Sequence, residues 1–89
     1  MTTELFRLRT EDLHWREIDG EVIALEARGS RYIASNPAGA VLWQELAEGA
    51  TRTGLAESLV GAFGIAPDRA LDDVDAFLAD LTARGLIES

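Results

Sequence analysis

Few residues in this chain have the types or the spacing that catalysis requires. His14 is the only histidine, cysteine is absent, and no serine lies in a nucleophile motif such as GxSxG. A lone histidine in a predicted strand is far more often a packing or surface residue than a general base. The sequence therefore predicts that this chain is not an enzyme acting on its own.

The carboxylates of "DDVD" at 72–75 are the candidates for a metal site. A calcium loop needs oxygen ligands at alternating positions, a glycine bend and a late glutamate. Asp72, Asp73 and Asp75 lie instead in a segment with helical periodicity, where their side chains fan around the axis. We interpret them as a solvated acidic face, and we expect neither a metal nor another cofactor.

Composition and charge limit the possible partners. The 89 residues suffice for one domain, and 8 Lys and Arg stand against 16 Asp and Glu, a formal charge of −8. This charge repels phosphate backbones and anionic lipid, so we expect neither nucleic acid nor a membrane as partner. No signal-peptide core and no run of about 20 apolar residues is present, which favours a cytoplasmic location.

The elements that must position any site divide the chain into two halves. Segments rich in β-branched and aromatic residues predict strands near 14–18, 21–26 and 31–35. Asp19-Gly20 predicts a type I′ turn between the first two strands, and "ARGS" at 27–30 predicts the second turn. Four aromatic residues are spaced like core residues: Trp15, Tyr32, Trp43 and Phe63.

Capping residues or prolines at the starts, and a glycine at each end, predict helices over 36–49, 51–64 and 67–85. Three strands followed by three helices predict a compact α+β domain over 13–89, preceded by a flexible lead-in at 1–12. The arrangement is that of a winged helix-turn-helix. Its helices offer few cations for a DNA groove among many acids, so DNA binding is not expected.

The third predicted strand is an edge of the sheet, with backbone N–H and C=O groups unpaired along one side. If the third helix lies beside it, the two form a groove suited to β-strand addition of a peptide. The alternative is that this edge is simply short and twisted. Composition and spacing leave both interpretations open.

From Trp15 to Ile87, about four-fifths of the chain, the sequence resembles the PqqD-like family, the RiPP precursor peptide recognition elements. No single match is specific, but the ordered series is. The matching residues are Tyr32, Asn36, Gly39, Leu42-Trp43, Leu46, Gly49-Ala50-Thr51, Leu55, Leu59, Phe63, Asp73-Val74, Phe77-Leu78, Leu81 and Gly85-Leu86.

The resemblance implies that the leader region of a ribosomally made precursor peptide binds as an added strand against the third strand and packs on the third helix. Chains of this size resemble the leader-binding proteins of lasso-peptide pathways, in which a separate leader peptidase and a cyclase act on the delivered peptide. The alternative is a PqqD-type peptide chaperone for a radical-SAM enzyme. A winged-helix regulator and an enzyme-docking subunit are further alternatives.

Carried onto this sequence, the resemblance implies that the strand side of the groove is formed mainly by backbone groups of Arg31, Tyr32, Ile33, Ala34 and Ser35. Tyr32 is expected to point into the core. On the third helix, Val74 lies near the centre of the apolar stripe, with Leu71, Leu78 and Asp75 on one flank. We expect this flank to line the groove, rather than the opposite flank, which carries Asp73, Phe77 and Asp80. The same open edge could pair two copies, so we expect a monomer or a weak dimer.

Overall fold

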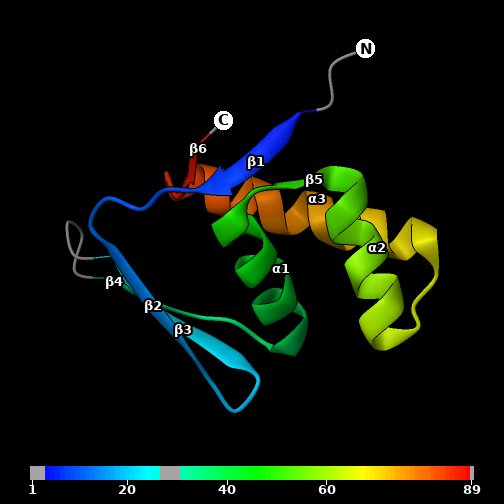
Figure 1. The fold of residues 1–89 in the computed structure, drawn as a ribbon, viewed down its shortest axis with the longest axis horizontal. Coiled ribbons are helices and arrows are strands. Elements are labelled where there is room, and N and C mark those ends of the chain that lie inside the picture. The colour runs from blue at the N-terminus through cyan, green and yellow to red at the C-terminus, as the bar shows by residue number, and fades with distance from the viewer. Residues whose placement is uncertain (1–3, 27–30, 89) are drawn as a thin grey trace.

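The computed structural model describes residues 4–26 and 31–88, and it has the predicted α+β class (Figure 1). The elements follow one another as β1 (Leu5–Leu8), β2 (Leu13–Ile18), β3 (Glu21–Glu26), β4 (Arg31–Ala34), α1 (Pro37–Glu48), β5 (Ala50–Thr51), α2 (Arg52–Phe63), α3 (Pro67–Ala83) and β6 (Ile87–Glu88). Within the described ranges no helix is long and apolar enough to cross a bilayer.

The first half forms the predicted antiparallel meander, with strand order β2-β3-β4. Asp19 and Gly20 both have positive φ, 52° and 80°, which a type I′ turn requires at its two central positions. The predicted hairpin is therefore confirmed. The second predicted turn, at 27–30, lies outside the described residues.

The N-terminal segment differs from the expected flexible lead-in. Strand β1 pairs antiparallel with β5 and with β6, in a second small sheet of order β5-β1-β6. Leu8 at its end is buried in the hydrophobic core. The expectation over 1–12 is thus wrong for 5–8, because the partners of this strand are about 45 and 80 residues away and leave no local signal.

The helices begin and end where the capping signals predict. Asn36 Oδ1 accepts the N–H of Gly39 at 2.8 Å, and Thr51 Oγ1 accepts that of Gly54 at 3.0 Å. Gly64 follows α2 in the left-handed conformation, with φ 67°. These local signals hold because each one satisfies backbone groups that a helix end leaves unpaired.

The core forms around α1, which packs against β1, β3 and α2, while α2 packs in turn against α3 (Figure 1). Trp43 is fully buried there and meets Trp15 edge to face, with ring centroids 6.2 Å apart. Of the four aromatic residues predicted in the core, only Trp43 is buried. The other three are exposed at the surface: Trp15, Tyr32 and Phe63.

Candidate functional site

Strand β4 is an edge of its sheet, and its hydrogen bonds show which backbone groups remain open. The N–H of Ser35 donates to the carbonyl oxygen of Val22 at 2.9 Å, and Ile33 lies opposite Ala24. Hydrogen-bonded pairs alternate along an antiparallel ladder, so Ile33 bonds inward to β3. The N–H and C=O groups of Tyr32 and Ala34 therefore point to the open edge.

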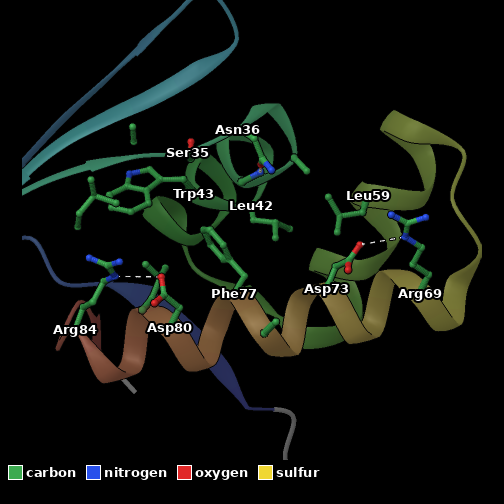
Figure 2. Close-up of a pocket in the computed structure, with 16 residues that line it drawn as sticks. Ser35, Asn36, Leu42, Trp43, Leu59, Arg69, Asp73, Phe77, Asp80 and Arg84 are labelled. Carbon is green, nitrogen blue, oxygen red and sulfur yellow. Dashed lines mark hydrogen bonds and ion pairs between the residues drawn. The ribbon is translucent and has the colours of Figure 1, made fainter.

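A groove of about 600 Å³ lies between this strand and α3 (Figure 2). Its strand side is formed by Ile33, Ala34 and Ser35, and α1 contributes Gly39, Leu42 and Trp43. From α3, Phe77 projects toward α1 in the middle of the groove. The groove therefore combines an open backbone edge with an apolar floor.

The α3 rim of the groove is charged but balanced. Arg84 Nε lies 3.1 Å from Asp80 Oδ2, and Arg69 Nε lies 3.8 Å from Asp73 Oδ2. Both pairs join residues one helical turn apart, and their side chains are largely exposed. Although the whole chain carries a charge of −8, this rim offers both signs of charge to a bound molecule.

Gly39 allows the close packing at the centre of this groove. A Cβ at this position would lie 2.9 Å from Ser35 Cβ and 3.4 Å from Phe77 Cε1. The first contact is shorter than real Cβ atoms show, and Ser35 Cβ is fixed to the strand backbone. A glycine is therefore needed where α1 begins against the end of β4.

The residues predicted on the strand side lie at the groove, with one correction. Ile33, Ala34 and Ser35 line it, and Arg31 lies in β4 opposite Glu26. Tyr32 belongs to the open edge through its backbone, but its side chain is 76% exposed. The expectation that Tyr32 points into the core is wrong, because Ile33 occupies the inner face and neighbours on a strand alternate.

The residues predicted on the helix side lie outside the groove. Val74 and Leu78 are buried in the core, and Leu71 lines a separate hollow beside Val60 of α2. Asp75 binds Arg52 instead. The groove is lined by the opposite flank, through Asp73, Ala76, Phe77 and Asp80. A helical wheel cannot distinguish the two flanks, because the choice depends on which of them packs against α2.

Asp75 forms a two-pronged pair with Arg52. Arg52 Nε donates to Oδ1 at 2.6 Å, and Nη2 donates to Oδ2 at 2.8 Å. These hydrogen bonds lower the pKa of Asp75 and raise the pKa of Arg52. Since both side chains are about half exposed, the pair is a surface link between α2 and α3.

The remaining side chains that could bind a metal or act in catalysis do not cluster in the described residues. In the part of the chain that the structure describes, no three His, Asp or Glu side chains gather as a metal site would require. His14 is exposed and lies opposite Leu25 in the β2–β3 ladder. The arrangement offers surfaces for noncovalent binding.

The fold and the groove define an α+β domain with an open strand edge beside a helix. The family model described as "Coenzyme PQQ synthesis protein D (PqqD)" matches residues 21–87. The chain belongs to this PqqD family, as the resemblance in its sequence indicated. No curated protein matches it significantly over its sequence.

Two solved structures share the fold. One is "TbiB1 in Complex with the TbiA(beta) Leader Peptide", with a TM-score of 0.83 and 20% identity, covering 93% of this chain and 95% of that one. The other is "Lasso peptide synthetase B1 complexed with the leader peptide", with a TM-score of 0.81 and 24% identity, covering 94% of this chain and 98% of that one. The predicted arrangement of three strands and three helices is confirmed.

Proposed function

We propose that this chain binds the leader region of a ribosomally synthesised precursor peptide as a strand added to β4. The observation that carries the proposal is the open backbone edge at Tyr32 and Ala34, which borders the groove containing Phe77. Backbone hydrogen bonds to the edge supply affinity, and the groove lining supplies selectivity. Both solved neighbours are complexes with a leader peptide, which supports this class of ligand.

In this proposal the chain presents the peptide and leaves the covalent chemistry to other proteins. The proposed partners are a separate leader peptidase and a cyclase of a lasso-peptide pathway. One of the two neighbours is described as "Lasso peptide synthetase B1", which supports a pathway of this kind. A second copy pairing through β4 would compete with the peptide for the same backbone groups. We therefore propose that the monomer is the form that binds the leader in the cytoplasm.

The family match favours one second candidate, a PqqD-type peptide chaperone that serves a radical-SAM enzyme. The same groove would bind the peptide in either case, so only the enzyme partner differs. Co-purification of the peptide-loaded chain with each enzyme encoded beside its gene distinguishes the two. Retention of a leader peptidase supports the lasso-type function, and retention of a radical-SAM enzyme supports the chaperone function.

The test of peptide binding uses fluorescein-labelled N-terminal segments of the short reading frames beside the gene. Each segment is titrated with the protein by fluorescence polarisation. We expect saturable binding near micromolar, about −8 kcal/mol, because ordering of the peptide offsets much of the contact energy. Amide NMR shifts should concentrate at 32–35 and along 73–80.

The variant Ala34→Pro tests strand addition directly. It removes an N–H that faces the open edge, and its ring occupies the place of the incoming strand, so affinity should fall at least tenfold. Ala34→Ser keeps the N–H and serves as the matched control. Unchanged affinity in folded Ala34→Pro would exclude β4 as the docking edge. Absence of binding by every segment to the folded protein would favour an enzyme-docking subunit.

A further inference from the structure

The outer face of the β2-β3-β4 sheet is apolar beside the open edge. Tyr32 lies opposite Leu25, and Ala34 lies opposite Ile23, with all four side chains on the face turned away from the core. Tyr32 is 76% exposed and Ile23 is 39% exposed, and Leu25 is partly buried. Apolar side chains gathered in water beside an unpaired strand edge mark a contact surface.

This face is also hollowed. It contains a depression of about 690 Å³. Tyr32 of β4 and Ile23 and Leu25 of β3 line one side of this depression. The other side is lined by four residues of β2: Leu13, His14, Trp15 and Arg16. Ala34 lies at the junction, because it lines the groove on the α3 side and belongs to the edge. The outer face is therefore continuous with the groove proposed for the peptide.

A strand added to β4 would contact both surfaces. Neighbouring strands lie about 4.8 Å apart, and side chains directly opposite one another share a face. The peptide residue opposite Ile33 therefore points into the groove toward Phe77. The residues opposite Tyr32 and Ala34 point the other way, onto the outer face.

We propose that the outer face reads the outward side chains of the bound peptide, so that the leader strand is apolar on both faces; this rests on the proposed function. Opposite Tyr32, the geometry favours a β-branched residue, which pairs well with an aromatic ring across strands. Opposite Ala34, it favours a large apolar residue. The small Ala34 side chain leaves room for such a residue to reach the exposed Ile23.

The test uses the tightest-binding leader segment from the titration above. Each of its residues is replaced in turn by Ser, and each peptide is titrated against the wild type, Tyr32→Thr and Ile18→Thr. Thr keeps strand propensity in both protein variants. Ile18 is the matched control, because it is an exposed apolar residue of the same face at the far end of β2, two strands from the edge.

We expect sensitivity at every position of the bound strand, in two alternating sets. Ser at the outward positions should weaken binding about two- to fivefold in the wild type, the size of a cross-strand pair. The loss at the position opposite Tyr32 should disappear in Tyr32→Thr and persist in Ile18→Thr. This coupling separates direct contact from a general effect on the fold.

Three results would overturn the inference. Outward positions that tolerate Ser, while inward positions do not, would leave strand addition standing but reject reading by the outer face. If Ser at the peptide position opposite Tyr32 weakened binding equally in Tyr32→Thr and in the wild type, Tyr32 would not contact the peptide. Absence of binding by any leader segment would reject the proposed function together with this inference.

Discussion

Hydrogen bonds between Ser35 and Val22 fix the end of β4. The Ser35 amide donates to the Val22 carbonyl at 2.9 Å, and the Val22 amide donates to Ser35 Oγ at 3.1 Å. The Ser35 side chain thus takes the acceptor role that a backbone carbonyl has in a regular ladder. The chain can leave the sheet toward α1 here without losing the register that turns Tyr32 and Ala34 outward.

This register predicts that proline destabilises the fold more at Ile33 than at its neighbour Ala34. Ile33→Pro removes an N–H that bonds inward to β3 and leaves a carbonyl of β3 without its donor, which costs about 1–3 kcal/mol in the free energy of unfolding. Ala34→Pro removes only an outward N–H and should change stability by less than about 1 kcal/mol. Urea denaturation of both variants measures the difference. Similar losses in both would contradict the deduced ladder.

The placement of the groove predicts that the two flanks of α3 differ in peptide binding. Phe77→Ala removes the apolar centre of the groove, so leader affinity should fall at least tenfold, in line with the burial energy of a large side chain. Leu71→Ala is the matched control, because Leu71 is also partly buried but faces α2. Fluorescence polarisation measures both. A greater loss in Leu71→Ala would restore the flank predicted from the sequence.

Alanine at two helical glycines should have opposite effects on stability. At Gly61 an added Cβ meets nothing within 4 Å, so Gly61→Ala should stabilise the fold by up to about 1 kcal/mol through helix propensity. At Gly39 the same Cβ lies 2.9 Å from Ser35 Cβ, so Gly39→Ala should destabilise it by about 1–3 kcal/mol. Thermal and urea unfolding test the pair. Stabilisation by both substitutions would show that β4 and α1 have room to separate.

The Arg52–Asp75 pair predicts a response to acid that does not involve the groove. Arg52 holds the pKa of Asp75 below the ordinary value of about 3.9. Its contribution to stability is therefore complete above that pH and is lost as the pH falls through the lowered pKa. NMR titration of the Asp75 carboxyl should show the pKa rising toward its ordinary value in Arg52→Gln. Leader affinity should stay unchanged in this variant, and a change in affinity would place the Arg52–Asp75 pair at the binding site.

Local signals in the sequence predict most of the fold. Asp19-Gly20 specifies its turn because both positions need positive φ, and Asn36 and Thr51 start helices because their side chains accept N–H groups that no helix carbonyl reaches. Strand β1 could not be predicted from the sequence, because a four-residue strand without a hairpin partner carries no periodic signal. Its partners β5 and β6 are distant in the sequence, and only the tertiary structure brings them beside it.

The sequence likewise predicts one part of the candidate site and leaves the other part to the tertiary structure. The sequence determines that the third strand ends the sheet and that α3 has an apolar stripe with two flanks, since alternation and helical periodicity are properties of the chain itself. Only the tertiary structure decides that Phe77 faces the groove while Leu71 and Asp75 face α2, and that Tyr32 points outward. These choices depend on which neighbouring element covers each face. That is set by the packing of the whole core, which no short stretch of sequence encodes.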